Sequence, residues 1–218
     1  QGGVKYWDGQ FNDAKLAMAL ARTAASRGAL LLNYCRAAYL RYENDKVSGL
    51  VCEDTLTGTQ YTLKTRCVVN ATGVWVDTLR QIDGAASGAS SKRATQPMVT
   101  PSQGVLMVVD RSFLPGTHAL LVPKTEDGRV LFAVPWLGKT ILGTTDTPRD
   151  DIVREPTPFK DEVAFILRES ARYLSKAPTR PDVRSVWVGL RPLVKPGGDD
   201  GDNTKQLSRE HTVLVGRS

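Results

Sequence analysis

The sequence has few residues of the types that build metal centres, disulfide frameworks or nucleophilic active sites. Its 218 residues include three cysteines, Cys35, Cys52 and Cys67, and two histidines, His118 and His211. The number of cysteines is odd and no pair has metal-ligand spacing, so we expect small buried side chains in a reducing compartment and no metal. Neither histidine stands in a catalytic motif, and we expect each to be a surface residue rather than a general base.

Common hydrolase and nucleotide-binding motifs are also absent. The sequence has no Gly-x-Ser-x-Gly, no His-Glu-x-x-His, no phosphate-loop lysine and no Gly-x-Gly-x-x-Gly, so it carries no dinucleotide-binding fingerprint of its own. Charged residues interrupt every apolar run well short of the ~18–20 residues that a transmembrane helix needs. The net charge of +6 is spread out, with no basic run longer than Lys92-Arg93, so we expect no nucleic-acid partner.

The segment Cys67-Val68-Val69-Asn70-Ala71-Thr72-Gly73 is the most informative stretch that is present. Its apolar start predicts a strand buried on both faces of a mostly parallel sheet. It ends in small residues, and ligands of open α/β sheets bind just outside the carboxyl ends of strands. Ala71, Thr72 and Gly73 are therefore either an edge that contacts a cofactor or an ordinary strand-to-helix turn. Spacing alone favours the turn.

The first part of the chain predicts alternating helices and strands. Asn12 can cap a helix that Gly28 ends, and a buried strand is expected over residues 29–34. Three strands of a hairpin-like excursion follow over residues 38–43, 47–53 and 60–65. A second helix is expected from Val74, with an N-terminus suited to an anion such as a pyrophosphate.

The composition changes at residues 84–95, where small residues indicate a linker and a domain boundary. The fold class we predict is a partial flavin-type α/β domain over residues 1–95, followed by a mostly antiparallel sheet with one helix over residues 96–218. The second part should contain strands over 104–110, 119–123, 129–136, 139–145, 185–190 and 212–215, a helix capped by Thr157, and a polar loop over 196–203.

Two polar clusters in the second part could bind a ligand. Arg191 lies between a strand and Pro192 among apolar residues, and its forked donors match a phosphate or a carboxylate. A structural ion pair is an equally good interpretation. Gly143-Thr144-Thr145-Asp146 follows a strand and could line a polar pocket. A turn held by local side-chain bonds explains it somewhat better when it is taken alone.

Taken together, these segments resemble the FAD-dependent glycerol-3-phosphate dehydrogenases. The resemblance covers nearly the whole chain, and its weight comes from six motifs in the family's order and approximate spacing. They are Tyr6-Trp7-Asp8-Gly9-Gln10-Phe11-Asn12-Asp13-Ala14-Lys15-Leu16, Val69-Asn70-Ala71-Thr72-Gly73, Pro101-Ser102-Gln103-Gly104-Val105, Val134-Pro135-Trp136, Gly143-Thr144-Thr145-Asp146-Thr147-Pro148 and Gly189-Leu190-Arg191-Pro192-Leu193.

The resemblance implies a flavoprotein oxidoreductase of glycerol metabolism. Such enzymes oxidise sn-glycerol 3-phosphate to dihydroxyacetone phosphate and pass electrons to quinone or to oxygen. Ala71, Thr72 and Gly73 would then contact FAD, which makes the flavin edge the better interpretation of that segment. Arg191 would bind the substrate, and Thr144, Thr145 and Asp146 would shape its pocket. The expected location is cytoplasmic, with peripheral contact to the inner face of the membrane.

The sequence departs from the family pattern in two respects. The family has a histidine after the Gly-Val of Pro-Ser-x-Gly-Val, placed to take the hydroxyl proton, and here that position is Leu106. Another base serves, or the histidine is not essential, or the chemistry differs, so no catalytic residue is assigned. The family's N-terminal Gly-x-Gly-x-x-Gly unit and its C-terminal Gly-Gly-Lys segment are also missing. We therefore expect an internal fragment that by itself is colourless, binds no FAD and is inactive.

Two other functions remain open from the sequence. A related FAD-dependent amine or amino-acid oxidase would also present an anionic substrate to an arginine. A catalytically inactive ligand-binding fragment is the third possibility, because part of the cofactor site would be absent.

Overall fold

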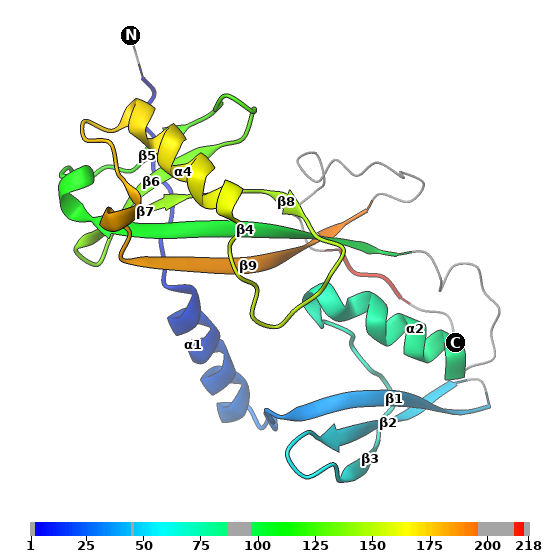
Figure 1. Cartoon of the computed structure of the whole chain (residues 1–218). Helices are drawn as coiled ribbons and strands as arrows, with labels where there is room; N and C mark the ends of the chain where they lie inside the picture. Colours follow the sequence, from blue (N-terminus) through cyan, green and yellow to red (C-terminus); the bar gives the residue numbers. More distant parts are fainter. Residues whose placement is uncertain (1–2, 45, 87–96, 196–211, 216–218) are drawn as a thin grey trace.

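The computed structural model describes residues 3–44, 46–86, 97–195 and 212–215. These residues form two antiparallel sheets, and Figure 1 shows helix α2 between them. The elements are, in chain order, α1 (Asp13–Ser26), β1 (Cys35–Glu43), β2 (Lys46–Asp54), β3 (Gln60–Lys64), η1 (Gly73–Trp75), α2 (Val76–Ala86), β4 (Val99–Asp110), η2 (Arg111–Phe113), β5 (Leu120–Val122), β6 (Leu131–Trp136), β7 (Lys139–Gly143), β8 (Thr147–Pro148), α4 (Lys160–Tyr173), η3 (Arg180–Asp182) and β9 (Ser185–Val194).

Helix α1 begins and ends where the capping residues predict. The Asn12 side chain accepts a hydrogen bond from the Lys15 backbone N–H at 3.0 Å. Gly28 follows the helix with φ at 88°, a left-handed conformation that glycine adopts without steric cost. None of the residues of α1 is buried.

The hairpin excursion is confirmed as the sheet β1–β2–β3. Asn44, at the β1–β2 turn, has a positive φ of 50°, as asparagine tolerates in tight turns. Helix α2 packs against β1, and the Tyr42 hydroxyl donates a hydrogen bond to the Asp83 carboxylate. This bond fixes the helix on the sheet.

Two strands expected to be buried do not form. Residues 29–34 and 67–70 are irregular, and the Leu30 and Val69 side chains are 83% and 82% exposed. Cys67, expected to be buried, is exposed as well. A strand exists only when neighbouring strands satisfy its N–H and C=O groups, and the described residues place no such neighbour beside either segment. Apolar sequence alone therefore does not produce the strand.

The second sheet has the order β5–β6–β7–β4–β8, and β9 also pairs with β4. All of these pairings are antiparallel, as the sequence predicts for residues 96–218. Figure 1 shows α4 lying across this sheet. The core lies between them and contains Val105, Met107, Val109, Phe113, Val122, Leu131, Ala133, Leu142, Phe165 and Ile166.

Strand β9 runs further than expected, through Pro192 to Val194. Pro192 lacks an N–H and would disrupt a central strand. In the described pairings β9 bonds to β4 alone, so it is an edge strand, where proline is tolerated. This extension places Arg191 within the strand rather than after it.

Helix α4 begins later than expected, because Phe159 rather than Thr157 is its N-cap residue. The Glu162 carboxylate accepts the Phe159 backbone N–H at 2.9 Å, while the Thr157 carbonyl accepts from the Gln103 side chain at 3.1 Å. A buried acid within the first turn thus replaces the expected hydroxyl cap.

The start of α2 connects the two sheets. Asp77 Oδ2 accepts the backbone N–H groups of Met98 at 2.8 Å and of Val99 at 3.0 Å, at the beginning of β4. Helix η1, directly before α2, contacts both β4 and β9. The segment that ends in Gly73 therefore lies next to the strand pair that carries Arg191.

The remaining expectations concern the end of the chain, the linker and membrane-spanning helices. Residues 212–215 form no strand and are exposed. Helix α2 continues to Ala86, into the stretch read as a linker. The rest of that linker, the loop at 196–203 and His211 lie outside the described residues. No helix in the described part of the chain is long and apolar enough to cross a membrane.

Replacing Asp77 with alanine should destabilise the chain by about 1–3 kcal/mol, because two partly buried N–H groups lose their acceptor. The measurement is urea unfolding of the 218-residue chain. Thr78→Ala, at the exposed neighbouring position, is the control and should change the free energy of unfolding by less than about 0.5 kcal/mol. Equal effects of the two substitutions would show that Asp77 does not connect the sheets.

Candidate active site

Arg191 lies on the face of the β4–β9 pair opposite to α4. Its Nη1 atom donates to the Thr145 carbonyl at 2.9 Å and its Nη2 atom donates to Thr144 Oγ1 at 2.8 Å. Both acceptors come from the segment that follows β7. The structure thus brings together Arg191 and the 143–146 cluster, which are well separated in the sequence. Two bonds to fixed acceptors hold the planar guanidinium in one orientation.

The Arg191 guanidinium lies directly against the backbone of Gly104. Gly104 is paired with Gly189 across β4 and β9. A Cβ atom on Gly104 would lie 2.2 Å from Arg191 Nη2 and 2.5 Å from its Cζ, so no larger residue fits beneath the guanidinium. A Cβ on Gly189 would meet no atom within 4 Å. Gly104 and Gly189 therefore form a flat area without side chains, which we call the floor, and the Arg191 guanidinium lies at one edge of it.

An apolar row borders this floor on the other side. Leu106 of β4 is opposite Trp187 of β9 and also opposite Gly143 of β7, which is opposite Phe132 of β6. Directly paired residues share a sheet face. Trp187 is 43% exposed and Phe132 is 37% exposed, so this face is apolar and accessible. A cation, an open floor and an apolar edge suit a small molecule with an anionic end and a carbon chain.

The residues expected to line the pocket have different positions. Thr144 is half-buried and contacts Arg191 directly. Thr145 is fully buried, and its hydroxyl bonds to the Val105 N–H and to Glu162 on the α4 side. Only its carbonyl reaches Arg191. The Asp146 carboxylate accepts from the Ser102 hydroxyl, which ties this segment to β4.

Gly104, Gly189 and Trp187 were not predicted as site residues. The signal that could have found them is alternation along a strand, because residues 187, 189 and 191 share one face of β9. The pairing with β4 then adds residues 104 and 106 to that face. This pairing is a long-range contact, which no local pattern reveals.

The expected cofactor edge, Ala71–Gly73, is exposed, and its last residue is the first residue of η1. Asn70 shapes it, because its Nδ2 donates to the Val76 carbonyl at 3.0 Å and its Oδ1 accepts from the Thr72 hydroxyl at 2.8 Å. Gly73 has φ at 61°, and a Cβ there would meet nothing within 4 Å. Small residues, open backbone and free space fit a flat ring system such as a flavin.

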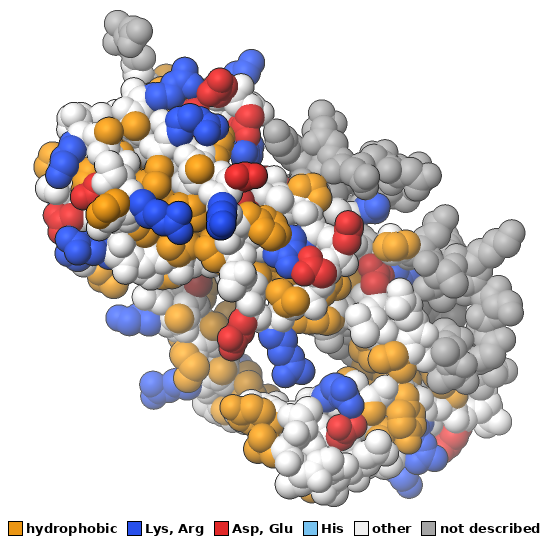
Figure 2. All heavy atoms as spheres, in the orientation of Figure 1, with side chains coloured by type: hydrophobic (Ala, Val, Ile, Leu, Met, Phe, Trp, Pro, Cys, Tyr) orange, Lys and Arg blue, Asp and Glu red, His pale blue; other side chains and the backbone are white. Residues whose placement is uncertain are grey.

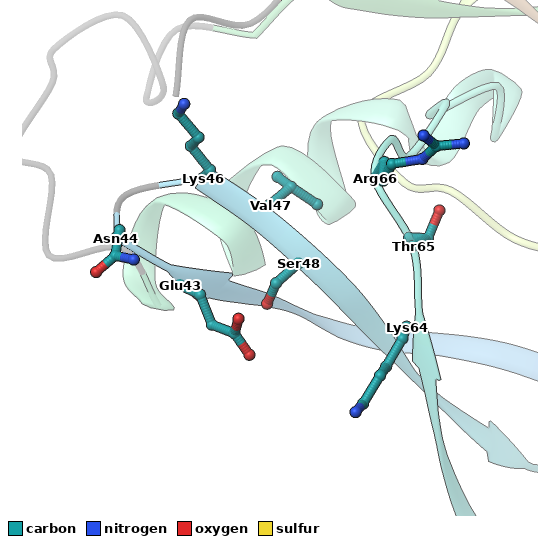
Figure 3. Close-up of a pocket in the computed structure, with 8 residues that line it drawn as sticks. All are labelled: Glu43, Asn44, Lys46, Val47, Ser48, Lys64, Thr65 and Arg66. Carbon is teal, nitrogen blue, oxygen red and sulfur yellow. The ribbon is translucent and has the colours of Figure 1, made fainter.

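A separate shallow hollow lies on the first sheet. Its lining includes Lys46, Lys64 and Arg66, and also the acidic Glu43. Figure 3 shows Lys46 and Arg66 directed to one side and Glu43 and Lys64 to the other, so the charges do not converge on one point. Figure 2 shows basic and acidic side chains interspersed, without a basic stripe on the face in view. Neither surface has the form of a nucleic-acid site.

Several titratable groups outside the Arg191 face have shifted pKa values. Burial, followed by the bond to Asp83, raises the pKa of Tyr42 to about 12. The Ser112 N–H, together with Lys139, lowers the pKa of Asp110 to about 2. Burial, then the neighbouring Cys35 thiol, raises the pKa of Cys52. His118 is exposed, and the described residues contain no cluster of potential metal ligands.

Replacing Gly104 with alanine should displace the Arg191 guanidinium from Thr144 and Thr145, because the new methyl group would occupy its position. The crystal structure of the variant measures this displacement directly. Gly189→Ala, at the paired position with open space, is the matched control and should leave both hydrogen bonds in place. An unmoved guanidinium in Gly104→Ala would contradict this account of the floor.

Comparison with known proteins gives the context of this site. The family model described as FAD dependent oxidoreductase matches residues 1–216. The mitochondrial glycerol-3-phosphate dehydrogenase of Bos taurus is 40% identical over 225 aligned residues, covering 100% of this chain and 29% of the relative. The Schizosaccharomyces pombe enzyme of the same name is 40% identical over 218 residues, covering 96% and 34%. The chain thus spans about a third of the length of these relatives.

Solved structures agree with the sequence relatives. The glycerol-3-phosphate dehydrogenase of Bacillus halodurans, complexed with FAD, matches 84% of this chain and 36% of its own, with a TM-score of 0.71 and 37% identity. The L-proline dehydrogenase of P. horikoshii has a TM-score of 0.55 at 18% identity, which shows a shared fold only. With the family model matching almost every residue, this chain belongs to the FAD-dependent oxidoreductase family.

Proposed function

We propose that this chain provides the substrate-side face and one flavin-contacting edge of a longer FAD-dependent enzyme, which oxidises sn-glycerol 3-phosphate to dihydroxyacetone phosphate. The observation that carries the proposal is the fixed Arg191 guanidinium on the Gly104–Gly189 floor, in the strand pair β4–β9 that η1 also contacts. Similarity to named glycerol-3-phosphate dehydrogenases over the full chain supports this substrate.

Each part of the site has a role in this reaction. Arg191 binds the phosphate, since a guanidinium gives paired donors to phosphate oxygens. The glycine floor allows the glycerol chain to lie close to the sheet, and Trp187 with Leu106 excludes water from its other side. Ala71, Thr72 and Gly73 lie against the flavin ring edge. When bound, FAD supplies the acceptor for the hydride of the carbinol carbon.

Thr144, Thr145 and Asp146 take supporting roles. Thr144 and the Thr145 carbonyl orient the guanidinium, and Asp146 fixes their segment to Ser102. A guanidinium that is already held in one orientation loses less conformational freedom when the phosphate binds, which contributes to affinity.

Further parts of the proposal concern the longer protein. Its electrons pass to quinone or to oxygen, and its location is cytoplasmic with peripheral contact to the inner face of the membrane. The relatives from Bos taurus and Schizosaccharomyces pombe are named mitochondrial. We also propose that residues 1–95 belong to the flavin side and residues 96–218 to the substrate side.

The alternatives receive less support. An amine or amino-acid oxidase has only the shared fold of L-proline dehydrogenase in its favour. An inactive ligand-binding fragment remains the expectation for the 218-residue chain alone, which should be colourless. A flavin absorption band in the purified chain would contradict that expectation.

Arg191→Ala, made in the longer protein, should raise KM for glycerol 3-phosphate by about 100-fold or more, because a charge-assisted contact to the phosphate is lost. FAD content, measured by absorbance, should not change. Arg184→Ala removes an exposed charge just before β9 and is the control, with KM expected within about twofold of the wild type. An unchanged KM in Arg191→Ala would remove Arg191 as the phosphate ligand.

Leu106→His, in the same protein, should raise kcat by about tenfold or more, because it places a proton acceptor on the face that carries Arg191. Leu106→Asn has a similar shape but accepts no proton at neutral pH, and should not increase kcat. Stopped-flow reduction of the flavin by glycerol 3-phosphate measures the step. If histidine is no better than asparagine, proton transfer at this position does not limit turnover.

A further inference from the structure

A buried carboxylate on the far side of the sheet is connected to Arg191. Glu162 lies in the first turn of α4 and is only 4% exposed. It accepts hydrogen bonds from Gln103 Nε2 at 2.7 Å, Thr145 Oγ1 at 3.0 Å, Thr147 Oγ1 at 2.7 Å and the Phe159 N–H at 2.9 Å. A buried charge requires this degree of satisfaction, since desolvation of an ion costs several kcal/mol.

Two of these four donors belong to the segment that holds the arginine. Thr145 directs its hydroxyl to Glu162 and its carbonyl to Arg191 Nη1 at 2.9 Å. Its hydroxyl also accepts the Val105 N–H at 3.0 Å, so both the hydroxyl and the carbonyl of Thr145 have defined partners. Thr144, directly before it, supplies the second acceptor of Arg191. A single residue, Thr145, therefore links the Glu162 carboxylate to the Arg191 guanidinium.

The remaining neighbours make the Glu162 anchor rigid. Gln103 Nε2 bonds to Glu162, and Gln103 Oε1 accepts from the Arg149 guanidinium. Arg149 is itself paired with Asp151 at 2.6 Å. The hydrogen bond to Asp151, and to a smaller extent the charge of Glu162, raises the pKa of Arg149. The Glu162 carboxylate is thus held by several neighbours, and its position is fixed.

We propose that Glu162 is a positioning residue for substrate binding, which sets the orientation of the Arg191 guanidinium through Thr145 and Thr147. It touches neither substrate nor cofactor. This inference rests on the proposed function, in which Arg191 binds the substrate phosphate. Its physical basis is that an ionised carboxylate accepts only, so both threonine hydroxyls must point away from the Arg191 face.

The test compares two buried acids of the same helix in the longer protein. Glu162→Gln should raise KM for glycerol 3-phosphate about fivefold or more, with kcat and FAD content within about twofold of the wild type, because the amide nitrogen cannot accept from its donors. Glu169→Gln is the matched control. Glu169 is fully buried on α4 but bonds to Arg172 and the Glu126 N–H, so KM should not change.

A pair of threonine variants checks the route. Thr145→Val removes the hydroxyl at nearly constant volume and should raise KM like Glu162→Gln, whereas Thr145→Ser keeps the hydroxyl and should restore the wild-type KM. In an Arg191→Ala background, Glu162→Gln should add no further increase in KM, since the group that it positions is gone. The crystal structure of Glu162→Gln should show the Arg191 guanidinium displaced from Thr144 and Thr145.

The inference is overturned if Glu162→Gln and Glu169→Gln change KM equally, or if the KM effect of Glu162→Gln persists without Arg191. If Arg191→Ala leaves KM unchanged, the proposed function is what fails. The crystal structure of Glu162→Gln then decides the coupling alone, because an unmoved guanidinium would overturn it and a displaced one would support it.

Discussion

Alternation of side chains along β4 is the constraint on which both the core and the site depend. Val105, Met107 and Val109 point toward α4 and form the centre of the core. Gly104 precedes Val105, and Leu106 lies between Val105 and Met107. Both therefore face the opposite side of the sheet, together with Arg191 and Trp187 of β9. A shift of one residue in the β4–β9 register would exchange the two sets and place the guanidinium against the core. Burial of three large side chains therefore also fixes the position of the site.

The same strand separates two kinds of polar chemistry. On the α4 side, Gln103 joins a closed network in which the Glu162 charge is fully hydrogen-bonded. On the other side, the half-buried Arg191 donates hydrogen bonds to the Thr144 hydroxyl and the Thr145 carbonyl. The buried network holds the segment after β7 in place, and this segment in turn bonds to the guanidinium. Preorganisation of a binding group by buried neighbours is the usual source of precise geometry in such sites.

Two apolar segments do not form the strands that their sequences favour. Leu30 and Val69 lie in stretches with strong strand character, yet both are largely exposed. Hydrophobicity indicates that a segment gains free energy from burial, but the partner must be present for the burial to occur. Asp77 shows the opposite case, because a single carboxylate with two backbone partners joins α2 to β4 without an apolar signal in the sequence.

Local patterns in the sequence determined the elements whose causes are local. The Asn12 cap, the Gly28 stop, the hairpin turn at Asn44 and the β-rich second part all follow from side-chain and backbone preferences within a few residues. The six ordered motifs likewise identified the flavin family, which the match over residues 1–216 confirms. Arg191 and Ala71–Gly73 were also recognisable as site candidates from their neighbours in the chain.

Only the tertiary structure decided which of these candidates lie together. Pairing of β4 with β9 places Gly104 beneath Arg191, and the segment after β7 turns one side of Thr145 to the arginine and the other to Glu162. The sequence grouped Thr144, Thr145 and Asp146 as equivalent pocket residues, because spacing does not reveal which side of the backbone each polar atom faces. Those directions depend on the contacts of Thr144 and Thr145 with Val105 and Arg191, which are 40 or more positions away in the sequence, and such contacts exist only in the folded chain.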